Sequence, residues 1–253
     1  MQSSEVNYSY SHQRPTLAAD IVLLGLSSEK LCLLLVQRGI EPFKGQWCLP
    51  GGHVDADENL AHAAARELSE ETSINVSELR QVATFADIGR DPRGWTASVV
   101  HFAAIAVNDS APKAADDAAD CRWFALDELP ELAFDHAEIV AFTIDSLGWL
   151  APNAAPHTSN PASTPRLIIW NGNNSSISSG AIPIPIKYIR QVLSSSVSAS
   201  RASAIQVAAA LAAWPLRSGH DVLIAGADFP NNELDQFLKF LETAANFVVI
   251  QNA

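Results

Sequence analysis

The chain of 253 residues has only three cysteines and no long apolar run. Cys32, Cys48 and Cys121 are an odd set without metal-ligand spacing, and their apolar or aromatic neighbours predict buried free thiols. No run approaches the roughly 18 apolar residues that span a bilayer. The polar stretch Met1–Arg14 lacks the apolar core of a signal peptide. We therefore expect a soluble protein in a reducing, cytoplasmic compartment.

Basic side chains are also scarce, with 16 lysines and arginines against 28 acidic residues and a net charge of −12. This balance argues against a broad basic face that holds nucleic acid. The excess acid lies entirely in residues 1–165, which carry 23 acidic and 10 basic side chains, whereas residues 166–253 carry 5 and 6. The acid therefore belongs to one part of the chain, as solvated surface or as part of a functional site.

The sequence divides into four parts: a tail (1–14), a larger unit (15–150), a linker (151–165) and a smaller unit (166–253). The linker contains four prolines among Asn, Ala, Ser and Thr. In the larger unit, apolar runs predict strands at 17–26, 31–37, 81–88, 96–107 and 122–125, with helices at about 57–72 and 136–150. This order predicts a mixed sheet with helices packed on it.

The smaller unit is predicted to be a parallel, Rossmann-like α/β domain. Short apolar runs predict buried strands at 166–171, 221–225 and 246–250. Helical patterns lie between them at about 186–193, 199–214 and 232–244. No Walker loop or complete dinucleotide-binding glycine motif accompanies them.

The most informative stretch reads Gly52-x5-Glu58-x7-Arg66-Glu67-Leu68-x-Glu70-Glu71-x-Ser73-Ile74. On a helix, Glu67, Glu70 and Glu71 fall within an arc of about 100° beside the apolar stripe. Carboxylates this close raise one another's pKa and destabilise the helix unless a cation neutralises them. Oxygen ligands on a rigid element suit Mg²⁺ or Mn²⁺, with substrate phosphates completing the coordination.

A solvated acidic helix face is the alternative, and it is the more common origin of a glutamate-rich helix. Here the spacing extends over more than twenty positions and follows Leu49-Pro50-Gly51-Gly52. The extended match favours a metal site.

The stretch resembles the signature of the Nudix hydrolases, which cleave nucleoside diphosphates linked to another group. Each defining position matches except that Ser73 stands where the family has a glycine near the helix end. Serine in that left-handed cap position costs ~1 kcal/mol and removes no metal ligand. Across 15–150 the chain looks like the branch that contains ADP-ribose pyrophosphatases and a related ADP-ribose-sensing transcriptional regulator.

The resemblance implies the Nudix α/β/α sandwich around a mixed sheet. It implies that Glu67, Glu70 and Glu71 ligate divalent metals, with the Gly51 carbonyl as a further ligand. Glu58 and Arg66 would be their supporting pair, which completes the implied catalytic set. It also makes a homodimer a candidate assembly.

The implied reaction is attack of a metal-activated water on one phosphorus of a pyrophosphate. ADP-ribose would give AMP and ribose 5-phosphate. The general base stays open between Glu70 or Glu71 and a carboxylate of the acidic loop, from Asp116, Asp117 or Asp120. That loop is equally well explained as a solvated turn.

Five residues are candidates for substrate contacts: Arg38, Trp47, Arg90, Arg93 and Asp117. The arginines could bind phosphate or ribose oxygens, although Arg90 and Arg93 also fit a hairpin turn with solvated charges. Trp47 could stack on a base, although an aromatic residue beside Pro50 is more often core.

The alternative function is a regulator whose Nudix unit binds ADP-ribose or a related nucleotide and controls a partner or DNA through residues 166–253. Sensing members of the resembled branch carry a DNA-binding winged helix after the Nudix unit. The basic residues after position 166 form no clear recognition helix. The expected partner is therefore a nucleotide-type small molecule, with no nucleic acid and no membrane.

Overall fold

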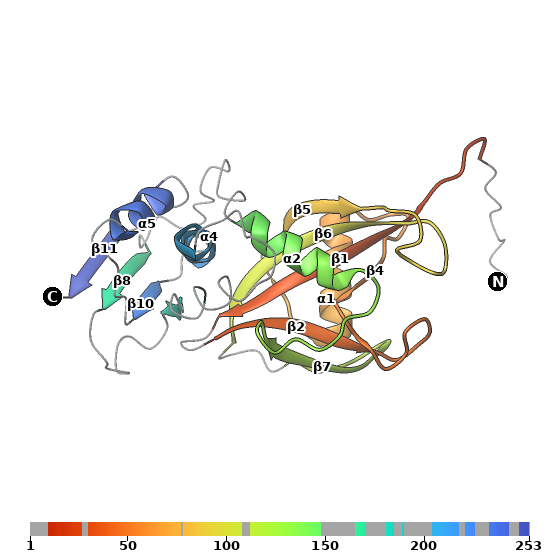
Figure 1. Ribbon diagram of the computed structural model, residues 1–253, viewed down its shortest axis with the longest axis horizontal. Coiled ribbons are helices and arrows are strands. Elements are labelled where there is room, and N and C mark those ends of the chain that lie inside the picture. The colour runs from red at the N-terminus through yellow and green to blue at the C-terminus, as the bar shows by residue number, and fades with distance from the viewer. Residues whose placement is uncertain are drawn as a thin grey trace.

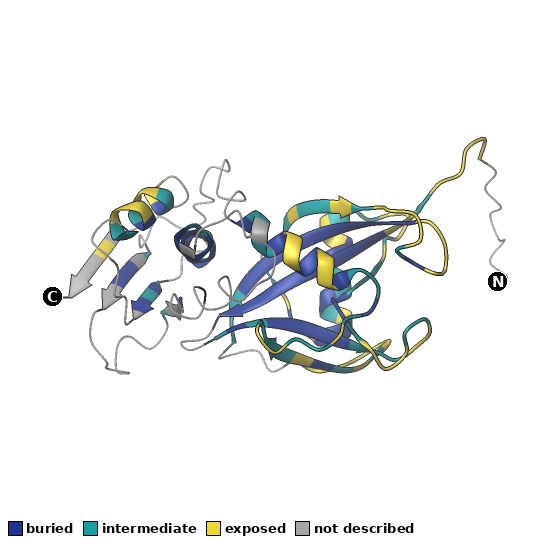
Figure 2. Ribbon diagram, viewed as in Figure 1, coloured by how far each residue is buried: buried dark blue, intermediate teal, exposed yellow. Residues whose placement is uncertain are grey.

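The two longest apolar runs form the centre of the first sheet. The computed structural model describes residues 10–26, 30–76, 78–107, 112–147, 165–170, 181–184, 189, 204–217, 221–225, 233–242 and 248–252. β1 (Thr16–Leu26) and β6 (Thr96–Ala106) pair in parallel along their full length of 11 residues. Successive residues of both strands are buried, which requires cover on both faces of the sheet (Figure 2).

The first sheet is mixed, as the sequence predicts. Its order is β3-β2-β1-β6-β5, with β4 paired to β1 and β7 paired to β2. The other strand pairs described in this sheet are antiparallel. The remaining strands are β2 (Leu31–Arg38), β3 (Trp47–Cys48), β4 (Gly51–His53), β5 (Arg80–Phe85) and β7 (Ala118–Ala125).

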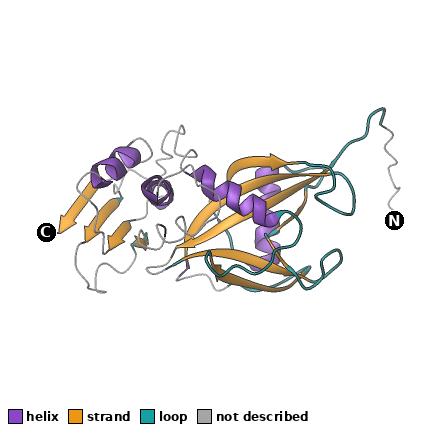
Figure 3. Ribbon diagram, in the orientation of Figure 1, coloured by secondary structure: helices purple, strands orange, loops and turns teal. Residues whose placement is uncertain are grey.

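Two helices, α1 (Leu60–Thr72) and α2 (His136–Leu147), lie on opposite sides of this sheet (Figures 1 and 3). The start of α1 was predicted about three residues too early. Asn59 caps the helix by accepting a hydrogen bond from the His62 amide at 3.0 Å, so Asp57 and Glu58 precede it.

Ser73 adopts the left-handed conformation that ends α1. Its φ is 59° and its amide donates to the Ser69 carbonyl at 2.9 Å. Serine thus takes the backbone conformation for which the resembled family uses glycine, at the cost expected for a residue with a side chain.

Two predicted strand boundaries were wrong. β5 ends at Phe85 rather than residue 88, and the exposed Ile88 belongs to the loop that follows. β7 begins at Ala118 rather than Arg122, because pairing with β2 continues to Arg38 through a bulge. Asp120 is therefore a strand residue.

The second unit contains a four-stranded parallel sheet with the order β11-β8-β10-β9. The strands near 166–171, 221–225 and 246–250 are present as predicted, and the two-residue β9 was not predicted. The 186–193 helix lies outside the described residues except Ile189, and so does the linker except Pro165. The elements are β8 (Arg166–Trp170), β9 (Ile182–Pro183), α4 (Ala204–Arg217), β10 (Val222–Ala225), α5 (Glu233–Glu242) and β11 (Val248–Asn252).

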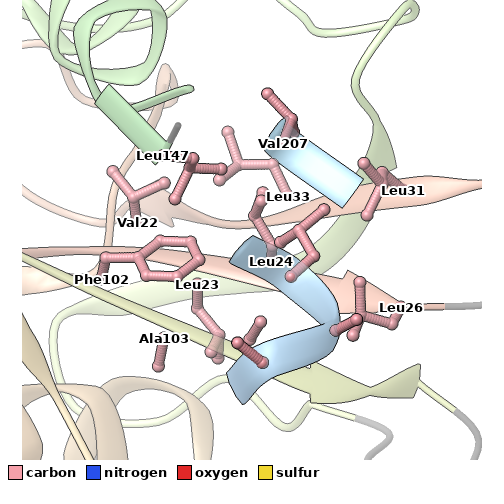
Figure 4. Packing of buried hydrophobic residues seen from close by; sticks show 14 of the residues in the cluster. Val22, Leu23, Leu24, Leu26, Leu31, Leu33, Phe102, Ala103, Leu147 and Val207 are labelled. Atoms are coloured by element: carbon pink, nitrogen blue, oxygen red, sulfur yellow. The ribbon is translucent and has the colours of Figure 1, made fainter. Parts of the chain in front are cut away.

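Helix α4 joins the hydrophobic cores of the two units. It contacts β6 and α2 on one side and β10 and α5 on the other. Val207 of α4 belongs to the same buried cluster as Leu24, Leu31 and Leu33 of the first sheet (Figure 4). Its many alanines allow close backbone approach, so an apolar end of the first sheet is covered by the second unit.

Among the described residues, no helix is long and apolar enough to cross a membrane. All three cysteines are free, with Cys48 and Cys121 buried and Cys32 half-buried.

Candidate functional site

A cavity of about 340 Å³ opens where β1 and β2 separate. The two strands pair only between Leu24–Leu26 and Leu31–Leu33. Beyond that point β1 pairs with β4, while β2 pairs with β3 and β7. The cavity is lined by side chains from both strands, from α1, from the β5–β6 loop and from the residues before β7 and α2.

The Gly51-Gly52 pair brings the backbone of β4 against α1. A Cβ at Gly52 would lie 2.5 Å from the Glu67 carboxyl group, and one at Gly51 would lie 2.4 Å from the Ala19 carbonyl oxygen. The Gly51 amide donates to Glu71 Oε2 at 3.0 Å. At Gly51 only glycine allows this approach, because the neighbouring atom is backbone, whereas a side chain at Gly52 would displace the Glu67 carboxyl group.

Arg66 is the centre of the acidic cluster. Its Nε and Nη2 donate to the two carboxylate oxygens of Glu58 at 3.1 and 2.6 Å. Its Nη1 donates to Glu67 at 2.9 Å and to Glu70 at 3.0 Å, and Nη2 also donates to the His53 carbonyl at 3.1 Å. The predicted Glu58–Arg66 pair is therefore present and bidentate.

The carboxylates of this cluster differ in their electrostatics. The hydrogen bonds from Arg66 lower the pKa of Glu58 to about 2. Burial raises the pKa of Glu71 to about 8, and the nearby charge of Glu67 adds to that effect. Burial likewise raises the pKa of Glu67, despite its hydrogen bond from Arg66. A buried carboxylate with a raised pKa lacks sufficient positive charge around it.

The donor set fits a hard divalent cation in its chemistry. Glu67, Glu70 and Glu71 all line the cavity and offer only oxygen. The described residues contain no ready group of three or more His, Cys, Asp or Glu side chains close enough to hold an ion. The reason is visible in the contacts: Arg66 binds Glu67 and Glu70, while Glu71 accepts from Gly51.

The arginines of the β5–β6 loop are each paired with one aspartate. Arg90 donates to both oxygens of Asp135 at 2.8 and 2.7 Å, and its side chain is buried. Arg93 donates to both oxygens of Asp91 at distances from 2.8 to 3.2 Å. Both arginines line the cavity, and each guanidinium is neutralised by its aspartate.

Arg38 has spare hydrogen-bonding capacity. Its Nε donates to the Pro42 carbonyl at 2.6 Å, and its guanidinium lies 5.0 Å from the Phe134 ring centre. Its Nη2 is buried and has no hydrogen-bond partner among the described residues. The Cys48 thiol, a weak acceptor, lies near the same guanidinium. Because buried N–H groups are nearly always satisfied, Nη2 indicates an oxygen-bearing ligand.

Trp47 lies elsewhere. It is absent from the cavity lining and packs edge-on against Phe124, with ring centres 4.7 Å apart. The core interpretation that accompanied this residue agrees with its position better than base stacking does.

Only some carboxylates of the acidic loop lie at the cavity. Asp116 and Asp117 line the cavity, and the charge of Asp116 reaches Glu67. Asp120 does not line it, because the residue lies in β7, pairs with Arg122 and accepts from the Cys121 amide at 2.8 Å. Of the three aspartates, two therefore stay candidates for the general base.

Sequence reasoning missed three lining residues, Asp20, Phe134 and His136. Asp20 and His136 are buried, and Phe134 has a positive φ of 56°. None belongs to a motif. A lone aspartate in the apolar β1 run was the only available signal, because burial of its charge requires polar partners.

Comparison with known proteins agrees with this geometry. A model of the NUDIX domain family matches residues 14–142. An ADP-ribose pyrophosphatase of Methanocaldococcus jannaschii is 36% identical over 135 residues, which cover 53% of this chain and 75% of that protein.

Two regulators are also similar. The ADPR responsive transcriptional repressor NtrR of Acinetobacter baylyi is 35% identical over 130 residues, covering 50% of this chain and 52% of the repressor. The match thus spans about half of that protein. The NUDIX domain of Shewanella oneidensis NrtR, solved with ADP ribose, has 32% identity and a TM-score of 0.50, covering 56% of this chain and 94% of that one. The family match and the cavity beneath the Glu58–Glu71 motif lead to one conclusion: the chain belongs to the Nudix family.

Proposed function

We propose that this chain hydrolyses ADP-ribose, or a closely related nucleoside diphosphate derivative, to AMP and ribose 5-phosphate. The observation that carries the proposal is a cavity lined by both carboxylates and arginines. Glu67, Glu70 and Glu71 line it, and so does Arg38, whose buried Nη2 has no hydrogen-bond partner among the described residues. A diphosphate that binds a cation held by the carboxylates and is also contacted by Arg38 would match these charges. The similarity to an ADP-ribose pyrophosphatase supports the choice of substrate.

Nudix hydrolases use divalent metal ions, and Mg²⁺ or Mn²⁺ suits the carboxylates here. When held by Glu67, Glu70 and Glu71 with the Gly51 carbonyl, such an ion would supply an activated water and neutralise charge on the leaving phosphate. Arg66 would orient Glu67 and Glu70 while keeping its bidentate contact with Glu58.

The protein side chains have three further tasks. Arg38 would donate from Nη2 to a phosphate oxygen, and Arg93, which lies 5.7 Å from the same Phe134 ring, would contact ribose or phosphate. Asp116 or Asp117 would take the proton of the attacking water, with Glu70 or Glu71 as the other choice. Arg90 would hold the loop through Asp135.

The test is product analysis with purified full-length chain, ADP-ribose and Mg²⁺ or Mn²⁺. We expect equal amounts of AMP and ribose 5-phosphate. A screen of NADH and nucleotide sugars in the same assay would establish the preferred leaving group. Absence of turnover on every nucleoside diphosphate compound would refute the hydrolase.

A ligand-sensing regulator is the second candidate. It is favoured by the docking of α4 on β6 and α2, which gives the second unit a physical route to respond to the first. The similarity to an ADPR responsive repressor supports it as well. This function predicts ADP-ribose binding without turnover and a ligand-dependent change in partner or DNA affinity.

We favour the enzyme and expect no nucleic-acid partner, because the net charge of −12 opposes binding to phosphate backbones. Electrophoretic mobility shifts with and without ADP-ribose would separate the two functions. The three free thiols support a reducing, cytoplasmic setting for either one.

A further inference from the structure

A buried series of polar contacts through His136, Asp20 and Ser98, outside the glutamate motif, holds the loop that carries Gly51 and Gly52. The Leu49 amide donates to Nδ1 of His136 at 2.9 Å, across 87 positions of sequence. Nε2 of the same ring lies 3.9 Å from Oδ2 of Asp20. Ser98 Oγ donates to that same aspartate oxygen. This series of contacts therefore joins α2, the β3–β4 loop, β1 and β6.

The neighbours of His136 define its tautomer. Since Nδ1 accepts from the Leu49 amide, the proton of the neutral ring must be on Nε2, on the side of Asp20. Burial lowers the pKa of His136, which favours this neutral form. In this tautomer Nδ1 accepts the hydrogen bond from the Leu49 amide, and the Nε2 proton lies on the side of Asp20.

The same loop segment is also attached to β1, because β4 pairs with it at Gly51, Gly52 and His53. The Ile21 amide donates to the Pro50 carbonyl at 2.9 Å, and the Gly51 amide donates to Glu71 at 3.0 Å. A Cβ at Gly51 would lie 2.6 Å from Oδ1 of Asp20, so Asp20 also forms the floor beneath the loop. The Leu49–His136 bond is thus two residues from the point where the loop meets Glu71.

We propose that His136, oriented by Asp20 and Ser98, is a positioning residue that holds the Leu49–Gly52 loop against Glu71 and so sets the affinity of the site for a divalent ion. This inference rests on the proposed function. Loss of a group that orients a metal ligand typically weakens metal binding by about 10- to 100-fold.

Three substitutions separate the two sides of the ring. His136→Asn places an amide oxygen where Nδ1 was and can still accept from Leu49. His136→Gln places its amide near the former Nε2 position, and His136→Leu retains neither group. Mn²⁺ binding to each full-length variant without substrate is measured by electron paramagnetic resonance, together with hydrogen exchange of the Leu49 and Gly51 amides.

We expect the Leu and Gln variants to bind Mn²⁺ about 10- to 100-fold more weakly and to exchange both amides faster. The Asn variant should stay close to the wild type in both respects. The control is His101→Gln, which alters a second buried histidine outside the cavity lining and should leave Mn²⁺ affinity unchanged.

Equal Mn²⁺ affinity in the wild type and the Leu variant would overturn the inference. So would equal losses in Asn and Gln, or an equal loss in His101→Gln. If the Leu variant does not fold, the Asn and Gln pair decides. A wild type that neither binds Mn²⁺ nor hydrolyses nucleotides removes the proposed function too, whereas an active wild type with unaffected variants removes this inference alone.

Discussion

Two clusters of arginines and carboxylates line one cavity, and they differ in charge balance. On α1 a single Arg66 serves Glu58, Glu67 and Glu70, while Glu71 has the Gly51 amide. In the β5–β6 loop each arginine has its own aspartate, as Arg90 with Asp135 and Arg93 with Asp91.

This difference shows which of the two clusters has too little positive charge and would be stabilised by a bound cation. In the β5–β6 loop the charges of each arginine and its aspartate cancel, and these ion pairs hold the loop in place at the edge of the cavity. The helix cluster has more carboxylates than cations, and burial raises the pKa of both Glu67 and Glu71. A divalent cation would stabilise the helix cluster but would not stabilise the arginine–aspartate pairs of the loop.

The largest expected effect comes from neutralising the helix cluster. We expect Glu70→Gln combined with Glu71→Gln to lower ADP-ribose hydrolysis by at least about 1000-fold, because both metal-binding charges are lost. The fold should persist, since a glutamine oxygen can still accept from Gly51. Thermal unfolding should also lose the stabilisation that Mn²⁺ gives the wild type.

The control for this double variant is Glu138→Gln, which removes an exposed carboxylate of α2 outside the cavity lining. It should retain activity and the Mn²⁺ response. Full activity in the double variant would show that the helix cluster is only a solvated acidic face.

The second-largest effect is expected from removing one arginine–aspartate pair of the β5–β6 loop. Arg90→Met leaves the half-buried Asp135 without its cation, which should lower the free energy of unfolding by about 3 kcal/mol in urea titrations. Arg122→Met removes the exposed pair with Asp120 and should cost at most about 1 kcal/mol. If Arg90→Met instead keeps its stability and loses substrate affinity, Arg90 is a substrate clamp rather than a loop anchor.

The third effect tests the arginine with a free donor. Arg38→Gln should weaken ADP-ribose binding about tenfold in calorimetry, because a charge-assisted hydrogen bond is lost from a buried position. Lys44→Gln makes the same charge change on an exposed side chain that does not line the cavity, and it should bind normally. Matching losses in the two variants would indicate a general electrostatic effect.

The smallest effect concerns acid stability. Burial acts to raise the pKa of Asp91, but hydrogen bonds from Arg93 and Thr96 outweigh it and lower the pKa below the ordinary 3.8. A lowered folded-state pKa contributes stability above that value, and the contribution is lost as pH falls through the folded pKa.

Asp91→Asn should therefore cost about 1 kcal/mol at neutral pH, and the difference from the wild type should shrink below about pH 4. Urea unfolding at several pH values measures it. The matched control is Asp57→Asn at an exposed position, which should change the free energy of unfolding little at neutral pH. If the difference in the free energy of unfolding between Asp91→Asn and the wild type persists at low pH, the charge of Asp91 does not contribute to stability.

The strongest sequence signals were local ones. Continuous apolar runs predicted β1, β2 and β6, because strands covered on both faces bury successive residues, and α2 was also predicted closely. The capping that delays α1 to Leu60 depends on one side chain, Asn59, and periodicity does not detect it.

For the site, the sequence alone determined the Glu58–Arg66 pair, the three helix carboxylates and the glycines beneath them, because one helix and its adjoining loop bring them together. Tertiary structure alone decided that Asp20, Phe134 and His136 join the cavity, that Trp47 and Asp120 do not, and that α4 covers the first sheet. Those contacts link positions far apart in the chain, and their strength comes from burial, which only the folded packing creates.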